Sequence, residues 1–459
     1  MVRPVLDRFF VLLALVILRA FFRAVEVAGR ERIPKGRPVL IVANHFNGFV
    51  DPVILVHVFG RVPRFLAKST LWNVRLARPL YTLAGMVPVH RPEDRTHRDS
   101  NESAFAAAHR VMLRRGHVAI FPEGTTHDVP ALARIRTGAA RIALGARAAG
   151  AEQLVIVPVG LAFDDKLALR SRVLARVGAP IDLDAELETF VARGEPEGEE
   201  NEAAVRRLTT EIEARLREVS PEYRDAREAR VLARAAEIAH RTGLRRHHAQ
   251  VPLAEQEPLA QRLAYAPPAA RQELTDALAR YHLDLDLLGL RDHQLVPGYT
   301  PRQLLADFLL TAAVVALLAP LWIPGFLLNF VPYQVVSAAG RATRNPVMKG
   351  SVRFFVALAA FPLVWTAVIV TSDVDGWLPT LGLMVLLPVS GIIAVGVLER
   401  IVRAFRAWRG WQALRDRRAL LGDLLEERRR LVAAVEDAAA QVPPGVERRP
   451  SARAGQATG

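Results

Sequence analysis

The chain has 459 residues, 51% of them hydrophobic, and a formal net charge of +14 at pH 7. It contains no cysteine, which excludes disulfides, thiolate catalysis and cysteine-based metal sites. The positive charge suits anionic lipid surfaces and phosphate-bearing substrates. Nucleic acid is the competing partner of a basic chain. Because the charge flanks apolar segments and no nucleic-acid motif is present, we expect no nucleic-acid binding.

The first segment, residues 1–24, predicts a membrane-anchoring helix. Its apolar core, Phe9 to Leu18, is bounded by arginines and is too short to span a bilayer. The sequence shows no convincing signal-peptide cleavage site before Val25. We therefore interpret this segment as an uncleaved helix that lies in the membrane interface.

Residues 25–184 predict an α/β domain with a largely buried sheet, because apolar β-branched runs alternate there with helical stretches. The strand-like runs are residues 38–43, 117–121 and 154–159, and the helix-like stretches include 103–115 and 139–149. Residues 185–300 predict a charged helical region, packed through an apolar face with helical spacing. That face consists of Leu208, Ile212, Leu216 and Val219.

Residues 301–398 predict a membrane region. The segment Leu304–Tyr333 is apolar but interrupted by prolines, whereas residues 354–371 and 377–398 each approach the ~20 residues that a crossing helix needs. The short link between these two spans is acidic. The basic loop Arg341–Lys349 and the arginine-rich stretch from Arg400 predict that both are cytoplasmic, with the acidic link outside.

The prolines allow Leu304–Tyr333 to form a re-entrant hairpin, with a turn near Pro320–Gly325. A hairpin would keep the α/β domain on the cytoplasmic face, whereas a single crossing would place it outside. Beyond the membrane region, residues 399–442 predict a basic helix that can self-associate, so a homo-oligomer is possible. Residues 443–459 predict a disordered tail.

Two motifs follow the first two strand-like runs. In Asn44-His45-Phe46-Asn47-Gly48-Phe49-Val50-Asp51-Pro52, a general base and a carboxylate come close together in sequence. Positions i and i+6 lie on different faces of a helix, so His45 and Asp51 meet only if a turn intervenes, and Asn47-Gly48 suits one. In Phe121-Pro122-Glu123-Gly124-Thr125, a carboxylate precedes a glycine turn whose N–H groups can hold an anion.

In this order, the two motifs resemble those of the glycerophospholipid acyltransferase family, and the resemblance covers about a third of the chain. His45 and Asp51 are separated by five residues, whereas the usual family motif has four. The longer form is closer to the fungal-type glycerol-3-phosphate/dihydroxyacetone-phosphate acyltransferases and their bacterial relatives.

The resemblance implies roles for individual residues. His45 would be the general base and Asp51 the carboxylate that orients it. Arg91 ends the block Gly85–Arg91, in which the family's arginine binds glycerol phosphate. The remaining residues implied in substrate binding are Glu123, Gly124 and Thr125 of the phosphate motif, Lys68 and Arg136. Glu123 itself repels phosphate, so we expect it to bind a hydroxyl or to orient a basic residue.

The resemblance further implies a membrane-bound O-acyltransferase of phospholipid synthesis. The acyl group would pass from acyl-CoA or acyl carrier protein to glycerol-3-phosphate or dihydroxyacetone phosphate, without a cofactor or a metal. Membrane lipids would be its further partners. Because these donors are cytoplasmic, we expect the catalytic domain on the cytoplasmic face of the cell membrane. An alternative acceptor is 1-acylglycerol-3-phosphate (lysophosphatidate), and a different class is a non-catalytic lipid-binding membrane protein.

Overall fold

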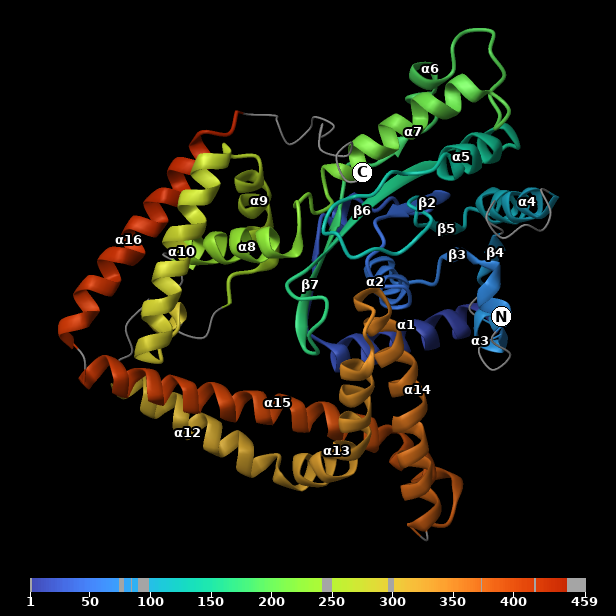
Figure 1. Cartoon of the computed structure of the whole chain (residues 1–459). Coiled ribbons are helices and arrows are strands. Elements are labelled where there is room, and N and C mark those ends of the chain that lie inside the picture. The colour runs from blue at the N-terminus through green and yellow to red at the C-terminus, as the bar shows by residue number, and fades with distance from the viewer. Residues whose placement is uncertain are drawn as a thin grey trace. The chain divides into compact units, whose positions relative to one another are not determined.

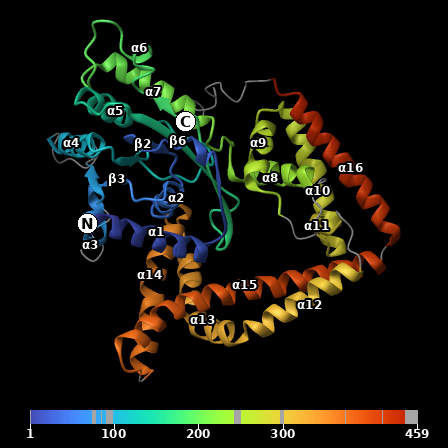
Figure 2. The same ribbon diagram turned by 180° about the vertical axis from the view of Figure 1, so that it is seen from behind.

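The computed structural model describes residues 2–73, 78–83, 85–89, 99–241, 250–295, 301–372, 374–416 and 418–443. The described chain divides into two compact units, Met1–Ala226 and Arg227–Pro443. Figures 1 and 2 show both from opposite sides, the first in blue to green and the second in yellow-green to red. The predicted tail, residues 443–459, lies outside the described residues except for Pro443.

The first unit is built on a mixed sheet of eight strands. In space the strands follow the order β1-β7-β6-β2-β5-β3-β4, and β8 pairs with β6. Strands β7 and β8 run antiparallel to β6, whereas the other neighbours are parallel. The strands are β1 (Phe22–Ala28), β2 (Val39–Ala43), β3 (Arg64–Lys68), β4 (Val87–Val89), β5 (His117–Ile120), β6 (Val155–Phe163), β7 (Ser171–Val177) and β8 (Ile181–Asp182).

Helices cover both faces of this sheet. Alternate residues of β2 point to opposite faces, so Leu40 and Val42 pack in one apolar core and Val39, Ile41 and Ala43 in the other. The first core includes α4, α5 and α7, and the second includes α1 and α2 (Figure 1). The helices are α1 (Val2–Phe21), α2 (Val50–Phe59), α3 (Arg78–Leu83), α4 (Asp99–Leu113), α5 (Gly138–Ala148), α6 (Leu187–Phe190) and α7 (Glu202–Arg217).

Helix α7 belongs to the sheet unit, which differs from the expected domain end at Asp184. Its apolar face, predicted from Leu208, Ile212 and Leu216, is buried against β2, β6 and α5 and not within a separate helical region. The chain after α7 passes so close to β6 that a Cβ on Gly160 would lie 1.8 Å from the Val219 carbonyl oxygen. A glycine is therefore required at that position.

Helix α1, the predicted anchor, has one buried and one exposed apolar side. Ala14 and Leu18 pack into the core beside α2. Phe9, Leu12 and Val16 are exposed. This division suits a helix that rests on the domain and presents apolar side chains to the membrane interface.

The second unit is helical over its described residues. Asp292 ties four of its segments together, because its carboxylate accepts hydrogen bonds from Tyr281 Oη (2.8 Å) and Arg428 Nε (2.7 Å) and forms an ion pair with Arg241 (3.0 Å). The helices are α8 (Ala226–His240), α9 (Leu253–Ala264), α10 (Pro268–Leu288), α11 (Asp292–Leu295), α12 (Pro301–Leu317), α13 (Ala319–Ala342), α14 (Pro346–Thr371), α15 (Trp377–Asp416) and α16 (Arg418–Ala440).

Three of the described helices contain segments long and apolar enough to cross a membrane: Ala319–Ala342, Met348–Thr371 and Trp377–Ala413. The expected turn near Pro320–Gly325 is wrong, because the helix break lies at Leu318 and α13 continues through both residues. Pro320 sits in the first turn of α13, where its missing N–H has no helical partner to lose. Inside the helix, Asn329 donates to the Gly325 carbonyl oxygen (2.8 Å).

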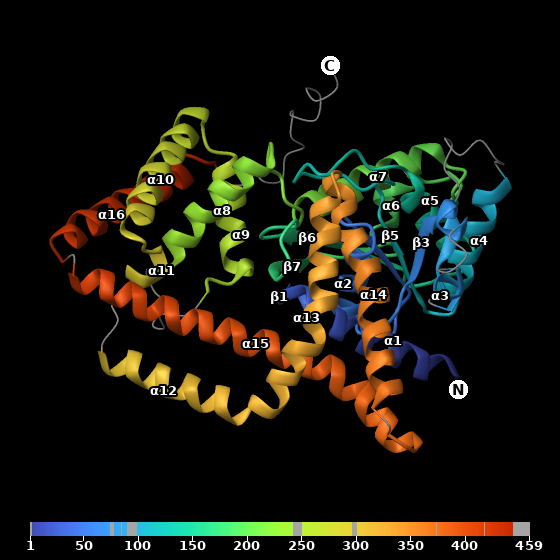
Figure 3. The ribbon, with the colours of Figure 1, turned by 60° about the horizontal axis from the view of Figure 1, so that its bottom comes forward.

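The expected boundary between the last span and the basic helix is also absent. Helix α15 runs without interruption from Trp377 to Asp416, and its polar second half continues the apolar first half. No proline follows Pro388 in α15, and Gly396, three residues before Glu399, is itself helical, so no local break ends the helix there. In Figure 3, α12 runs alongside this second half of α15.

Candidate active site

The two motifs meet at one edge of the sheet because their strands are parallel neighbours. Strand β2 ends at Ala43 and β5 at Ile120, and Leu40 and Val42 of β2 pair with Val118 and Ile120 of β5. The segments that follow both strands therefore leave the sheet at its carboxyl edge. Ligands of open α/β sheets bind outside this edge.

Asn44 fixes the start of the histidine loop. Its side chain is fully buried, donates to the Leu161 carbonyl oxygen (3.0 Å) and accepts from the Leu161 N–H (2.7 Å). An amide side chain thus replaces the backbone pairing that β2 loses where it ends. The backbone just before His45 is therefore held against the neighbouring strand β6.

His45 and Asp51 form a hydrogen-bonded pair. The chain bends after His45 and turns at Gly48–Phe49, which brings Asp51, in the first turn of α2, back towards the imidazole. His45 Nδ1 lies 3.0 Å from Asp51 Oδ2. The same oxygen accepts the N–H groups of Phe46 (2.8 Å) and Asn47 (2.7 Å). The turn that the spacing requires thus lies at Gly48–Phe49, one residue later than the Asn47-Gly48 pair that was expected to form it.

The Asp51 carboxylate is buried, but hydrogen-bond donors surround one of its oxygens. The carboxylate is inaccessible to solvent, and among the described residues Oδ1 has no hydrogen-bond partner. Burial raises the pKa of Asp51, and the bonds from His45, Asn47 and Phe46 oppose that rise. The His45 side chain keeps 15% of its surface exposed. Its ring stacks on Phe121, with centroids 4.0 Å apart.

Glu123 holds the second loop against the first. Its buried carboxylate accepts from the backbone N–H of His45 (2.6 Å) through Oε1 and from the backbone N–H of Ala133 (2.8 Å) through Oε2. His127 Nε2 also contacts Oε2, and His127 Nδ1 lies 3.0 Å from the Val129 carbonyl oxygen. The structure thus pairs Glu123 with a basic residue, one of the two expectations for it. Contact of Glu123 with substrate stays a prediction.

The glycine turn has the expected backbone form. Gly124 has a φ of +71°, and its N–H donates to the Phe121 carbonyl oxygen (3.0 Å). A Cβ at this position would lie 2.9 Å from Arg136 Nε, so the arginine side chain passes directly over the turn. Thr125 is exposed beside it. The structure therefore brings Gly124, Thr125 and Arg136 together near Glu123.

The other two predicted residues are only partly described. Lys68 is the last residue of β3, which is parallel to β5, so its backbone lies at the same edge of the sheet. Arg91 lies outside the described residues. Their roles in binding substrate stay predictions.

One residue beside the site, Lys166, was not predicted from the sequence. Lys166 donates to the His127 carbonyl oxygen (3.1 Å), forms an ion pair with Asp128 and lies 5.7 Å from the centroid of the Phe46 ring. It follows β6, which is parallel to β2 and ends at Phe163. The sequence signal was weak, because Lys166 stands seven residues beyond the expected strand at 154–159 and β6 extends further, to Phe163.

Comparison with known proteins identifies the α/β part. Residues 24–162 match the family model described as Acyltransferase. This part of the chain is an acyltransferase-family domain. It contains β2, β5, the His45–Asp51 pair and the Glu123 loop. The predicted family resemblance is thereby confirmed.

Two curated fungal proteins and one solved structure are similar to the chain. Glycerol-3-phosphate O-acyltransferase 2 of Saccharomyces cerevisiae is 29% identical over 202 residues, which cover 43% of this chain and 26% of the yeast protein. An uncharacterized acyltransferase of Schizosaccharomyces pombe is 33% identical over 84 residues, 17% of this chain and 12% of that protein. The chain thus matches about a quarter or less of these relatives' length.

The solved structure is the crystal structure of the 1-acyl-sn-glycerophosphate (LPA) acyltransferase from Thermotoga maritima. It is 19% identical, covers 46% of this chain and 77% of its own, and has a TM-score of 0.34.

The acyltransferase domain contains a histidine–carboxylate pair whose geometry suits general-base chemistry. His45 Nε2 makes no hydrogen bond to any described residue, so it can receive a proton while Nδ1 is held by Asp51. A transfer reaction in which an alcohol is the acceptor needs no serine or cysteine nucleophile, because the alcohol itself supplies the attacking oxygen. Among the described residues, no group of three histidine or carboxylate side chains is placed to bind a metal ion.

Proposed function

We propose that the chain is a membrane-bound O-acyltransferase that passes an acyl group from acyl-CoA or acyl carrier protein to glycerol-3-phosphate or dihydroxyacetone phosphate. The observation that carries this proposal is the His45–Asp51 pair, held by two backbone N–H groups at the carboxyl edge of an acyltransferase domain. The printed name of the yeast relative, a glycerol-3-phosphate O-acyltransferase, supports this acceptor.

In the proposed reaction, His45 Nε2 removes the proton of the acceptor hydroxyl as its oxygen attacks the thioester carbonyl carbon. The buried Asp51 carboxylate stabilises the resulting imidazolium. When the tetrahedral intermediate collapses, the carbon–sulfur bond breaks and the imidazolium returns its proton to the thiolate. The products are the acyl ester and the free thiol, and His45 is neutral again.

Basic groups near the pair suit a phosphorylated acceptor. The Arg136 side chain covers the glycine turn, and the backbone of Lys68 reaches the same edge of the sheet. An arginine can contact a phosphate through two parallel N–H groups. We propose that Arg136 and Arg91 bind the acceptor phosphate, with Lys68 adding charge.

The proposal is tested by incubating the purified full-length protein with a labelled acyl donor and a panel of acceptors. Both acyl-CoA and acyl carrier protein are supplied as donors. Acylation of glycerol-3-phosphate or dihydroxyacetone phosphate supports the proposal. Exclusive acylation of lysophosphatidate selects the alternative acceptor. Absence of transfer to every acceptor, by protein that is folded and binds lipid, indicates the non-catalytic class.

A matched pair of histidine variants assigns the base. His45→Ala should lower turnover by about 10²–10⁴-fold, because it removes the general base. His57 lies in α2, within the same domain, and its ring is not part of the site. His57→Ala should therefore retain turnover close to that of the wild type. Near-normal turnover in folded His45→Ala protein would contradict the assignment.

We propose that the acyltransferase domain lies on the cytoplasmic face, where the acyl donors are. Three crossing helices alone would put this domain and the C-terminal region on opposite faces. The proposal therefore requires that the chain between α12 and α14 enters and leaves the membrane by one face, without a completed crossing by α13. The basic Arg341–Lys349 segment and the C-terminal helix would then be cytoplasmic.

Single introduced cysteines test this orientation, since the chain has none of its own. An impermeant thiol reagent should label a cysteine at Val374 in intact cells. Cysteines at Gln303, Thr343 and Leu421 should react only after permeabilisation. External labelling at Gln303 would place the acyltransferase domain on the far side of the membrane and would refute the orientation.

A further inference from the structure

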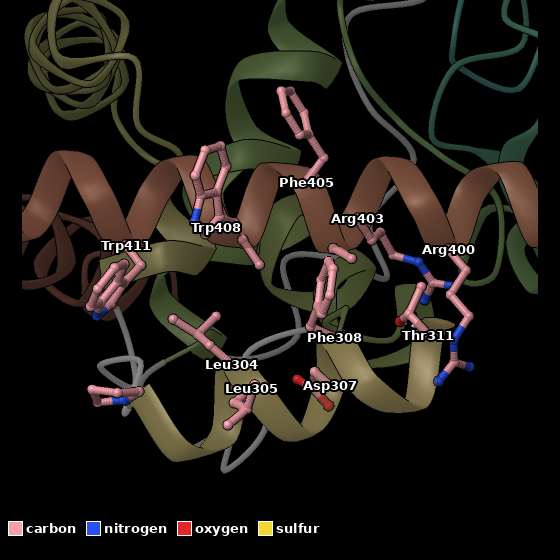
Figure 4. A pocket seen from close by; sticks show the side chains of 13 residues that line it. Leu304, Leu305, Asp307, Phe308, Thr311, Arg400, Arg403, Phe405, Trp408 and Trp411 are labelled. Atoms are coloured by element: carbon pink, nitrogen blue, oxygen red, sulfur yellow. Dashed lines mark hydrogen bonds between the residues drawn. The ribbon is translucent and has the colours of Figure 1, made fainter. Parts of the chain in front are cut away.

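A groove lies between α12 and the second half of α15, within the second unit. Its volume is about 650 Å³ (Figure 4). One wall comes from Leu304, Phe308 and Thr311 of α12, and the other from residues of α15 spaced by about one turn. The groove is apolar along most of its length. Its α15 wall includes Arg400, Arg403, Ala404, Ala407 and Trp411.

Two cations gather at one end of this groove. In Figure 4, Arg400 and Arg403 both project from α15 towards Thr311, whereas Trp411 lies at the other end beside Leu304. Arg400 Nε lies 3.3 Å from Thr311 Oγ1. Over the described residues, no carboxylate forms an ion pair with either guanidinium, although Asp307 also lines the groove. Arg403 Nε donates to the Glu399 carbonyl oxygen (3.3 Å), and the remaining N–H groups of the two adjacent guanidinium groups can attract an anion that both contact.

The position of the groove along α15 places it beside the membrane. Helix α15 has 40 residues, about twice the length that crosses a bilayer. Its apolar first half ends just before Glu399, so Arg400 begins the part that emerges from the hydrocarbon. Arginine and tryptophan are typical of this interface, where charged head groups meet acyl chains. The α12 side chains Leu305, Phe308 and Leu309 are exposed there.

We propose that this groove binds one anionic glycerophospholipid from the bilayer. The lipid phosphate would lie between Arg400 and Arg403, accept hydrogen bonds from both, and be further contacted by the Thr311 hydroxyl. One acyl chain would leave the bilayer and follow Leu304, Phe308 and Ala404 along the groove towards Trp411, while the other stays among the bilayer lipids. The site would take phosphatidic acid or another lipid with net negative charge in preference to phosphatidylcholine. It is separate from the His45–Asp51 site and does not depend on the proposed acyl transfer.

Charge and shape together favour a lipid as the occupant. A small soluble phosphate would satisfy the arginines but would leave the apolar length of the groove in contact with water. An uncharged apolar segment would fill that length but would leave two guanidinium groups unpaired beside it. A lipid with an anionic head group matches both parts at once, and the bilayer supplies it at high local concentration.

The test is native mass spectrometry of the detergent-purified full-length protein, titrated with phosphatidic acid or with phosphatidylcholine of the same acyl chains. We expect saturable retention of one phosphatidic acid per chain and weak retention of phosphatidylcholine. Arg403→Gln should weaken phosphatidic acid binding about tenfold, and Arg400→Gln with Arg403→Gln about a hundredfold, since each charged hydrogen bond contributes about one factor of ten or more.

Two further variants distinguish lipid binding in the groove from attraction to the overall positive charge of the protein. Arg406 lies one turn along α15 and is not part of the groove, so Arg406→Gln changes the charge equally and should leave binding unchanged. Ala404→Trp fills the groove without changing the charge and should reduce lipid retention. Proteins are compared only where thermal unfolding shows that they are folded.

Three results would overturn the proposal. Equal weakening by Arg403→Gln and Arg406→Gln would show attraction to the overall charge. Equal retention of phosphatidic acid and phosphatidylcholine would show that the arginines do not recognise the phosphate. Displacement of the lipid by millimolar glycerol-3-phosphate, with undiminished binding to Ala404→Trp, would show a site for free phosphates alone.

Discussion

Asp51→Asn is the most informative single change at the proposed active site, because the structure predicts that the amide fits. Asp51 Oδ2 accepts the N–H groups of Phe46 and Asn47 and contacts His45 Nδ1, whereas Oδ1 has no partner among the described residues. The asparagine oxygen can replace Oδ2, and its amino group then occupies the position of Oδ1. The turn and the orientation of the imidazole should both survive.

The loss should therefore be electrostatic. Two unit charges 3.0 Å apart, the distance between His45 Nδ1 and Asp51 Oδ2, interact by about 5 kcal/mol at an effective dielectric constant of about 20. If about half of the imidazolium charge has developed in the transition state, the carboxylate stabilises it by about 2–3 kcal/mol more than the amide does. That difference corresponds to a fall in kcat of about 10²-fold.

Steady-state acyl transfer from a labelled donor measures this fall, and circular dichroism with thermal unfolding confirms that the variant is folded. Asp51→Ala provides the comparison, because it removes the acceptor of two backbone N–H groups as well as the charge. Its kcat should fall further than that of Asp51→Asn, and its melting temperature should drop. An Asp51→Asn variant with unchanged kcat but a raised KM for the acceptor would refute the reasoning and place Asp51 in substrate binding.

Three other changes test neighbouring features. Glu123→Gln must turn an amino group towards a backbone donor or His127. The free energy of unfolding should therefore fall by about 1–3 kcal/mol, and kcat should also be lower. Unchanged stability would contradict the proposed role of Glu123 in joining the two loops. Arg91→Ala should raise the KM for the phosphorylated acceptor more than that for the acyl donor, whereas an effect on the donor alone would exclude phosphate binding. Burial, with the Arg61 charge, lowers the pKa of His117 to about 4. Between that pKa and about 6.5, the unfolded chain binds a proton at His117 and the folded chain does not. The free energy of unfolding therefore decreases as the pH is lowered, by up to about 1.4 kcal/mol per pH unit. In denaturant titrations, the free energy of unfolding should decrease less between pH 7 and pH 5 for His117→Gln than for the wild type. An equal decrease in both proteins would refute the role of His117.

The sequence was sufficient to predict the features that depend on a local pattern of residues. The apolar runs at residues 38–43, 117–121 and 154–159 correspond to β2, β5 and β6. The motifs after β2 and β5 meet because these strands are parallel neighbours, a pairing that the apolar runs alone did not indicate. The turn between His45 and Asp51 followed from the spacing alone.

Features that depend on contacts distant in sequence were not predictable in this way. The apolar face of α7 is equally suited to a separate helical region and to the sheet, and only the tertiary fold selects the sheet. The prolines of α13 predicted a turn, but neighbouring helices preserve the helix. Trp365 Nε1, for example, donates to Asn329 Oδ1 (2.9 Å). Tertiary contacts therefore override a local preference against helix at these positions.

The three loops at the carboxyl edge are joined by buried polar side chains, which explains how the site can be ordered without disulfides. Asn44 ties the histidine loop to β6, and Glu123 ties its own loop to the His45 backbone. His127 extends this connection, and Lys166 joins it to the loop after β6 through the His127 carbonyl oxygen. His127 contacts the Glu123 carboxylate, so the loop that binds the His45 backbone N–H is itself held in place, and the geometry of His45 is supported both by Asp51 and by Glu123.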